Sequence, residues 1–248
     1  MGLYKELVKV NTESSFVPKE EQEIRKILRS SHLIEENMYK EFNQRKFHFV
    51  KQPDNQFGSF FAMFAEENNR ERFLYPHMDQ YAVLFDIGAA VGSWTLPALT
   101  LGAKAIAFEP DPRSIDTLYR SISLNGFNIR AVLLNYAVFD TDNQLISFDE
   151  LEEVPTITID SVVEKLELFP SYIKIDVEGA ESRVIQGGLK TIKEHKPKIF
   201  LENHLKYTPG SKEHIDKILL EEIGYRSQVV PIYAPEHRSS DISFSFFY

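Results

Sequence analysis

The strongest constraint on the fold is a rhythm of short apolar runs and helical stretches that starts at Tyr81. Seven runs have the length and composition of β-strands: 82–86, 103–108, 130–134, 172–175, 198–201, 225–233 and 242–248. Helical patterns fill most of the intervals, up to residue 101 and at 113–124, 161–168, 180–195 and 212–223. Strands that alternate with helices form parallel β-α-β units. The sequence therefore predicts an α/β fold, a seven-stranded, mostly parallel sheet with helices on both faces. The last two strands have no helix between them, so we expect a terminal antiparallel strand.

Residues 1–80 lack this rhythm and are predicted to form an N-terminal extension of a main domain at 81–248. Glu20–Phe42 is charged and has apolar residues at helical spacing, which indicates an amphipathic helix. Phe47–Phe64 is dense in phenylalanine around a turn signal, which indicates a strand or hairpin. This segment could pack as a satellite core or serve as an apolar lid over a substrate pocket, and both interpretations stay open.

Charge and cysteine content exclude several classes of function. The net charge is −9, and an acidic chain repels nucleic acid and anionic membrane surfaces unless it carries a local basic patch. There is no cysteine, which excludes disulfides, a thiolate nucleophile and cysteine-ligated zinc. No apolar run approaches the ~18 residues of a membrane span, and the first residues do not resemble a signal peptide. We expect a soluble cytoplasmic protein without nucleic-acid or membrane partners.

Ligands of open α/β sheets bind at the carboxyl ends of the strands, where the sequence places glycines and acids. Asp86 ends one predicted strand, and Gly88 and Gly92 follow in a turn before a helix. The spacing differs from the G-x-G-x-x-G pattern of dinucleotide sites. Glu109 ends the next strand, where a carboxylate can accept hydrogen bonds from both ribose hydroxyls and would repel a 2′-phosphate. Together these residues predict a nucleoside site.

The segments Asp86-Ile-Gly-Ala-Ala-Val-Gly92, Phe108-Glu-Pro110 and Ile173-Lys-Ile-Asp-Val-Glu-Gly-Ala-Glu181 resemble motifs of the FkbM-type family of class I S-adenosylmethionine-dependent methyltransferases. The resemblance spans about residues 84–203 and implies a Rossmann-like methyltransferase fold with S-adenosylmethionine across two strand ends. It departs from the family at Ala90, where an Asn is usual. The cofactor-binding residues that it implies are Asp86, Gly88, Ala89, Gly92, Glu109, Pro110, Asn135, Ala137 and Asp176.

Acidic residues at two further strand ends are candidates for catalysis. Asp176 and Glu178 could act as general base on an acceptor hydroxyl, whereas Glu181 is explained by the dipole of the helix that it begins. His204 is the other candidate base because imidazole titrates near neutrality. Asp176, Glu202 and Asn203 resemble the oxygen ligands of metal-assisted O-methyltransferases and could hold Mg²⁺.

The residues directly after the fourth strand indicate the class of acceptor. Methyltransferases that act on base amines usually carry an (Asn/Asp)-Pro-Pro-aromatic motif there, and this chain has Asp176-Val-Glu-Gly179. The resemblance favours O-methylation of a small molecule or sugar hydroxyl. Two alternatives stay open, a nucleic-acid methyltransferase and a non-catalytic module that only binds the cofactor.

Overall fold

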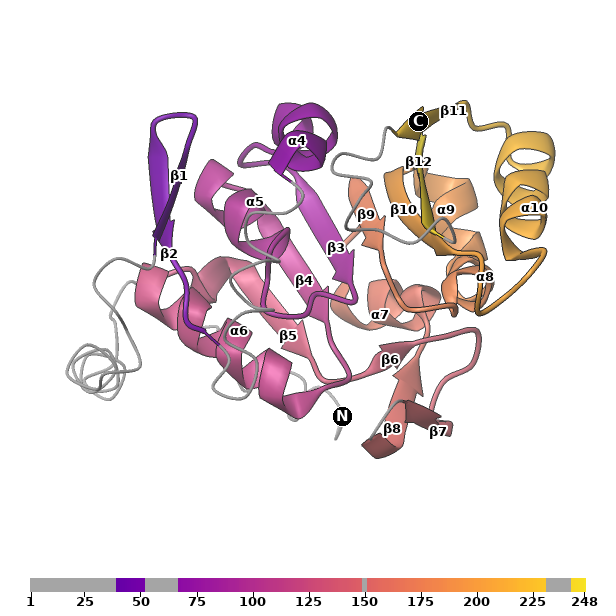
Figure 1. Cartoon of the computed structure of the whole chain (residues 1–248), viewed down its shortest axis with the longest axis horizontal. Helices are drawn as coiled ribbons and strands as arrows, with labels where there is room; N and C mark the ends of the chain where they lie inside the picture. The colour runs from indigo at the N-terminus through magenta and orange to yellow at the C-terminus, as the bar shows by residue number, and fades with distance from the viewer. Residues whose placement is uncertain (1–38, 52–66, 149–150, 231–241) are drawn as a thin grey trace.

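The apolar runs predicted as strands assemble into one seven-stranded sheet in the computed structural model, which describes residues 39–51, 67–148, 151–230 and 242–248. In spatial order the strands are β11 (Ser227–Val230), β12 (Ile242–Phe247), β10 (Lys198–His204), β9 (Tyr172–Ile175), β3 (Val83–Ile87), β4 (Lys104–Phe108) and β5 (Ala131–Leu134). Only β12 runs antiparallel to its neighbours in this sheet, between β10 and β11. The predicted α/β fold with its mostly parallel sheet and late antiparallel strand is confirmed (Figure 1).

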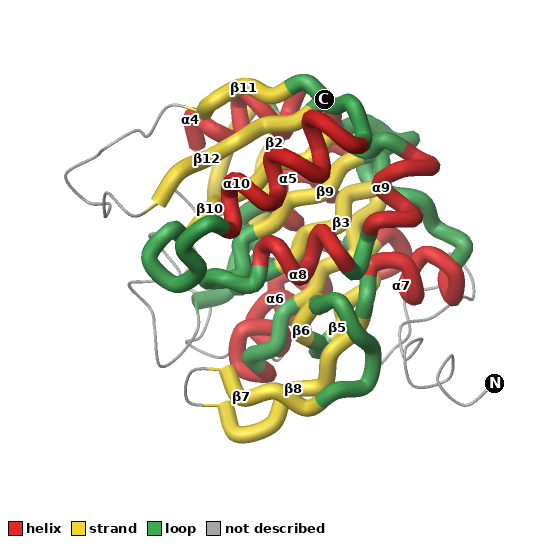
Figure 2. Tube along the Cα trace, turned by 90° about the vertical axis from the view of Figure 1, so that its right-hand side faces the viewer, coloured by secondary structure: helices red, strands yellow, loops and turns green. Residues whose placement is uncertain are grey.

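Helices cover both faces of this sheet. The helices on one face are α5 (Thr95–Leu101) and α6 (Pro112–Asn125). On the other face lie α7 (Ile159–Leu166), α8 (Glu181–Gln186), α9 (Leu189–His195), α10 (Ser211–Asp216) and its π-helical continuation η4 (Lys217–Glu222). Figure 2 views the sheet through this second layer. None of the helices in the described part of the chain is long and apolar enough to cross a membrane.

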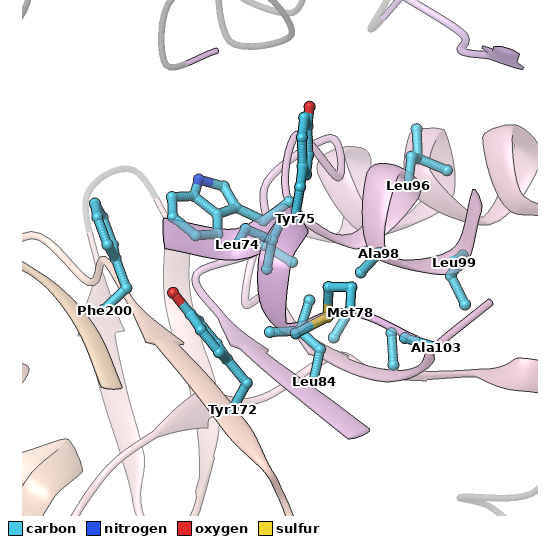
Figure 3. Packing of buried hydrophobic residues seen from close by; sticks show 14 of the residues in the cluster. Leu74, Tyr75, Met78, Leu84, Leu96, Ala98, Leu99, Ala103, Tyr172 and Phe200 are labelled. Carbon is cyan, nitrogen blue, oxygen red and sulfur yellow. The ribbon is translucent and has the colours of Figure 1, made fainter. Parts of the chain in front are cut away.

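The central strands are mostly apolar because both of their faces are buried, with Asp86 in β3, Lys104 at the start of β4 and Lys174 in β9 as their charged residues. In β3, Leu84 packs into the core under α5, while Phe85 and Ile87 pack into the core under α7 and α8. Figure 3 shows part of the first core, where Leu84 lies among Met78, Leu99 and other apolar side chains. Because β10, β9, β3, β4 and β5 are parallel, their carboxyl ends and the polar residues there lie at the same edge of the sheet.

The helix predicted over residues 180–195 is two helices, α8 and α9, separated at Gly187 and Gly188. A Cβ added to Gly187 would lie 2.0 Å from the carbonyl oxygen of Phe139, so this point of the chain packs directly against another backbone segment. The pattern of apolar residues continues through the break, and for this reason the periodicity alone predicts one helix.

Three short strands between β5 and α7 were not predicted. They are β6 (Ala137–Val138), β7 (Leu145–Phe148) and β8 (Leu151–Ile157), and they form a small sheet in the order β6-β8-β7. In Figures 1 and 2 this sheet protrudes at one end of the molecule, next to β5. Its position allows it to add a wall to any cavity at the ends of β4 and β5.

The N-terminal part differs from its prediction. Residues 39–42, the end of the predicted helix, form strand β1 (Tyr39–Phe42), which pairs with β2 (Arg45–His48). The helix prediction is wrong for these four residues, and 20–38 lie outside the described residues. Of the Phe-rich segment, Phe47 and Phe49 are buried in the core with α5 and α6, and 52–64 lie outside the described residues. The lid therefore stays a prediction.

The described chain resumes with three short helical pieces that lead into β3. They are α4 (Glu67–Asn69), the π-helical η1 (Arg70–Leu74) and the 3₁₀ turn η2 (Tyr75–His77). A last 3₁₀ turn, η3 (Asn128–Arg130), precedes β5.

Candidate functional site: a cavity at the strand ends

The turn after β3 requires a glycine at its first position. Gly88 has a φ of +75°, and a Cβ added there would lie 1.8 Å from the carbonyl oxygen of Asp176. The amides of Gly88 and Ala89 both donate to the carbonyl of Phe108, at 3.0 Å each. The turn is thereby hydrogen-bonded to the end of β4 and packs directly against the backbone at the end of β9.

Glu109 is held by the backbone on both of its carboxylate oxygens. Oε2 accepts from the amide of Ala90 at 2.8 Å, and Oε1 accepts from the amide of Asp111 at 2.9 Å. The side chain is buried, and burial raises the pKa of its carboxyl to about 7 although these two hydrogen bonds act in the opposite direction. Each oxygen keeps acceptor capacity for a further donor.

Ala90 supplies one of these amides from a left-handed conformation, with φ +46°. For residues other than Gly, Asn and Asp, this conformation costs about 1–2 kcal/mol relative to the right-handed one. The Asn that is usual at this position in the family suits the same backbone, so the substitution at Ala90 keeps the turn at some cost in stability.

Beneath the turn lies a buried ion pair that the sequence analysis did not predict. Asp86 is fully buried, and its Oδ2 accepts a hydrogen bond from the hydroxyl of Thr95 at 2.6 Å. The Nζ atom of Lys174 lies 3.5 Å from Oδ1 of Asp86 and 3.4 Å from Oδ2 of Asp176, and it donates to the carbonyl of Gly88 at 2.7 Å. The lysine in the otherwise apolar strand β9 could have indicated a buried acidic partner, but the sequence analysis did not use it.

A cavity of about 230 Å³ opens beside the turn. Among its lining residues are six that the sequence predicted: Gly88, Glu109, Pro110, Ala137, Asp176 and Glu178. The remaining lining residues are Ile87, Ala90, Phe108, Tyr136, Val138, Phe139, Ile146, Val177 and Ala180. Among the lining residues, all of which the structure describes, there is no lysine, arginine or histidine. The wall is mainly apolar and its charged groups are carboxylates.

Other predicted cofactor residues do not line the cavity but contact the segments that form it. Asn135 donates through Nδ2 to the carbonyls of Glu109 and Pro110, at 2.8 Å each, so both amide hydrogens hold the loop that carries Glu109. A Cβ on Gly92 would lie 2.3 Å from Cδ1 of Leu118, which shows how closely α6 approaches this glycine. Asp86, Ala89, Gly92 and Asn135 are absent from the cavity lining.

His204 lies at the centre of a group of carboxylates next to the cavity. Its Nδ1 is 2.7 Å from Oε1 of Glu181. Its Nε2 faces Oε2 of Glu178 at 3.6 Å, Oδ1 of Asp176 at 3.8 Å and Oε1 of Glu202 at 3.8 Å. Burial lowers the pKa of His204, but the hydrogen bond to Glu181 and the nearby carboxylates outweigh it, so its pKa is raised above the usual value.

The predicted metal ligands are only partly brought together. Asp176 and Glu202 were predicted as ligands, and together with His204, which was not, they offer ligand atoms within 4.8 Å of one another. Asn203 lies between Glu202 and His204 in β10, and successive side chains of a strand point to opposite faces, so its side chain is on the other face of the sheet. Its Nδ2 donates there to the carbonyl of Ser243 at 3.3 Å.

A family model described as the methyltransferase FkbM domain matches residues 86–227, which is more than half of the chain. The chain belongs to the FkbM methyltransferase family. The matched region contains the turn at Gly88, Glu109, the Asp176 loop and His204, so the cavity and the carboxylate group both lie within the FkbM domain.

Solved structures share the fold of this FkbM domain. The chain is similar to the FkbM methyltransferase of Methylobacillus flagellatus, with a TM-score of 0.57 and 21% identity over 69% of this chain and 44% of that one. It is also similar to a putative rRNA methylase from Clostridium thermocellum, with a TM-score of 0.53 and 7% identity over 74% of this chain and 94% of that one. Likenesses at such identities show the class I methyltransferase fold alone. This chain spans less than half the length of the M. flagellatus protein. No curated protein compared with it matches.

Several cavity residues of the FkbM domain could not be found from the sequence. Ile146 comes from β7 in the small sheet, and no local pattern indicates that this strand folds back onto the ends of β4 and β5. Tyr136, Val138 and Phe139 follow β5 directly, and their apolar character was the available signal. The partner of Glu181 could not be found either, because the start of a helix explains an acid at this position equally well.

Proposed function

We propose that this FkbM-family protein is an S-adenosylmethionine-dependent methyltransferase that methylates a hydroxyl of a small molecule or sugar. The observation that carries the proposal is Glu109, a buried carboxylate held by two backbone amides at the wall of the cavity. Its remaining lone pairs can accept hydrogen bonds from the two hydroxyls of a ribose.

The chemistry of the lining suits this cofactor. Phosphate sites are built from basic side chains, from a P-loop with its lysine or from the G-x-G-x-x-G turn of dinucleotide sites. The cavity lining has no basic side chain, and the turn from Gly88 to Gly92 has neither of the two glycine patterns. The apolar part, which includes Phe108 and Tyr136, can receive an adenine ring, while Asp176 and Glu178 give the other part a negative potential that favours a sulfonium. When bound, S-adenosylmethionine supplies the electrophilic methyl group.

Support for an oxygen acceptor comes from the group around His204. Asp176, Glu178 and His204 place candidate proton acceptors next to the cavity, which methylation of a hydroxyl requires. The net charge of −9 and the absence of a basic lining give a nucleic-acid substrate no support. A cation held by Asp176, Glu202 and His204 could lower the pKa of a hydroxyl and would assist the same reaction.

Titration calorimetry with S-adenosylmethionine and S-adenosylhomocysteine tests the cofactor. We expect micromolar binding that Glu109→Ala weakens by about 1–3 kcal/mol, since the ribose hydroxyls lose their acceptor. Glu164→Ala, on the exposed side of α7, is the matched control and should bind as the wild type does. Absence of binding by the wild-type protein would refute the proposal. Cofactor binding without formation of S-adenosylhomocysteine in the presence of any hydroxyl acceptor would favour a non-catalytic module.

A further inference from the structure

We propose that the end of the cavity at Asp176 and Glu178 selects a cationic tail: Glu178 binds the ammonium of the cofactor's amino-acid part, and no described basic side chain binds its carboxylate. The ligand class of the site is then a 5′-thioadenosine with a primary amine in its tail, with or without a carboxylate. The inference rests on the proposed function and deepens it, because it says which half of the amino-acid part the protein recognises.

Asp86, which the family resemblance makes a cofactor-binding residue, cannot bind this ammonium directly. Its side chain is fully buried and is absent from the cavity lining. Its Oδ2 accepts from the hydroxyl of Thr95 at 2.6 Å, and its Oδ1 faces the ammonium of Lys174 at 3.5 Å. The carbonyl of Gly88 accepts from the same ammonium at 2.7 Å. An ammonium of the protein therefore already lies at these oxygens.

Glu178 is the more accessible of the two acids at this end of the cavity. Both acids line the cavity, but the side chain of Glu178 is 56% exposed and that of Asp176 is 32% exposed. Glu178 and Gly179 have φ values of +53° and +107°, and this left-handed backbone costs energy at Glu178. The hydroxyl of Thr208 donates to the carbonyl of Gly179 at 3.1 Å, and Oε1 of Glu181 accepts from its amide at 3.0 Å. These two contacts hold the turn that places Glu178 at the wall of the cavity.

The two acids can bind two different charges of the cofactor. Oδ2 of Asp176 faces the ammonium of Lys174 at 3.4 Å, so this carboxylate is partly neutralised by the protein. Nε2 of His204 lies 3.8 Å from Oδ1 of Asp176 and 3.6 Å from Oε2 of Glu178, so the two carboxylates are close neighbours. Only three carbon atoms separate the sulfur of the cofactor from its amino nitrogen. A sulfonium beside Asp176 therefore places the ammonium within reach of Glu178.

The carboxylate of the amino-acid part meets the same negative charge. No lysine, arginine or histidine is among the described residues that line the cavity. The side chains of Lys174 and His204 are each 5% exposed, and both already face carboxylates. These carboxylates belong to Asp86, Asp176, Glu178, Glu181 and Glu202. Even when His204 is protonated, the five negative charges exceed the two positive ones by three. The site therefore attracts an ammonium and repels a carboxylate.

Calorimetry with three nucleosides and the full chain tests this selectivity. The ligands are 5′-deoxy-5′-thioadenosines whose sulfur carries a methyl, a 3-aminopropyl or a 3-carboxypropyl group, so that the last two have tails of similar length and opposite charge. The buffer is at about pH 8, where Glu109 is ionised, and contains EDTA to keep metal ions from the acids. We expect the amine ligand to bind at least about tenfold more tightly than the carboxylate ligand, with the methyl ligand between them.

Variants identify the carboxylate that is responsible. Glu178→Gln should remove most of the difference between the amine and carboxylate ligands and leave the affinity of the methyl ligand unchanged. It should also weaken S-adenosylmethionine and S-adenosylhomocysteine by the same factor, since both carry the amino group. Asp86→Asn should keep most of the difference, and Glu164→Gln, on the exposed side of α7, should keep all of it. Melting temperatures show which variants are folded.

The results separate this inference from the proposed function. If the wild type binds the methyl ligand but binds the carboxylate ligand as tightly as the amine, the inference is wrong and the proposed function stands. A difference that survives Glu178→Gln, or that Asp86→Asn abolishes in a folded protein, also overturns the inference. If the wild type binds neither the three nucleosides nor S-adenosylhomocysteine, the proposed function is refuted, and the inference is refuted with it.

Discussion

The role proposed for Glu109 predicts that cofactor affinity depends on pH, because this carboxyl is buried. Its carboxyl pKa is about 7 in the folded protein, against 4.5 for an ordinary glutamate side chain. At 1.36 kcal/mol per pKa unit, ionisation at this site costs about 3 kcal/mol more than in water. The folded state holds the Glu109 proton more tightly than the unfolded state does, and this preference stabilises the unliganded protein at low pH. The stabilisation is fully present below pH 4.5 and is lost as pH rises through about 7.

The free protein favours the protonated carboxyl of Glu109, whereas a bound nucleoside would favour the ionised carboxylate. The ribose hydroxyls donate to the carboxylate, so the ligand binds the ionised form and shifts the pKa of Glu109 downward. Below about pH 7 the free protein is mostly protonated at Glu109, and affinity should fall by up to about tenfold per pH unit. Asp111 and Lys174 are the charged groups that also act on this carboxyl, in opposite directions.

The assay is calorimetry with S-adenosylhomocysteine between about pH 8 and about pH 5.5, a range that spans the pKa of Glu109. Adenosine is the matched ligand, because it offers the ribose to Glu109 without the ionisable amino-acid part. Glu109→Gln is the matched variant; it should bind more weakly throughout and lose the pH slope. An affinity that is flat over this range in the wild type, or the same slope in Glu109→Gln, refutes the reasoning.

Three further substitutions test the walls of the site. Gly88→Ala should lower the free energy of unfolding by more than about 2 kcal/mol in urea, since its Cβ would overlap the carbonyl of Asp176; Gly224→Ala, with φ +83° and no atom within 4 Å of its Cβ, isolates the backbone cost, and equal losses would contradict the overlap. Ala90→Asn should raise the free energy of unfolding by about 0.5–1 kcal/mol, because Asn tolerates the left-handed backbone, and a lower melting temperature would count against this account. Ile146→Asp should weaken adenosine binding about tenfold or more by placing a charge in the apolar wall, with unchanged binding showing that β7 does not contact the ligand.

The fold was predictable because the strands that define it are buried on both faces. Runs that are almost wholly apolar, such as 103–108 with Lys104 as its one charged residue, indicate strands directly. The polar residues at their ends locate the cavity at Gly88 and Glu109. The small sheet was not predicted because polar residues and a proline interrupt its strands: β8 contains Glu152, Glu153 and Pro155, and Leu145 of β7 is 61% exposed. Neither a continuous apolar run nor a regular alternation therefore distinguishes these strands from a loop.

The roles of polar residues were harder to predict than their positions. Asn135 occurs where the family resemblance places an adenine-binding residue, yet its amide hydrogens hold the loop of Glu109. Glu181 occurs where a helix dipole explains an acid, yet its side chain is buried against His204. In each case the deciding partner is distant in sequence, and a single sequence does not record which distant groups meet.

The distribution of charge around the site leads to a last prediction. Asp176, Glu178, Glu181 and Glu202 all lie around His204. The ammonium of Lys174 lies 3.4 Å from Oδ2 of Asp176. A positively charged sulfonium is therefore favoured beside Asp176, and this attraction disappears when the methyl group has left. Asp176→Asn, which keeps the shape and removes the charge, should weaken binding of S-adenosylmethionine by about 1 kcal/mol or more and affect S-adenosylhomocysteine much less. Calorimetry with both ligands measures the difference. An equal loss of affinity for the two ligands would mean that Asp176 contacts the part that they share. A loss for S-adenosylmethionine alone would mean that the site binds the methyl donor through a positive charge that the reaction removes. Removal of this charge would favour release of S-adenosylhomocysteine.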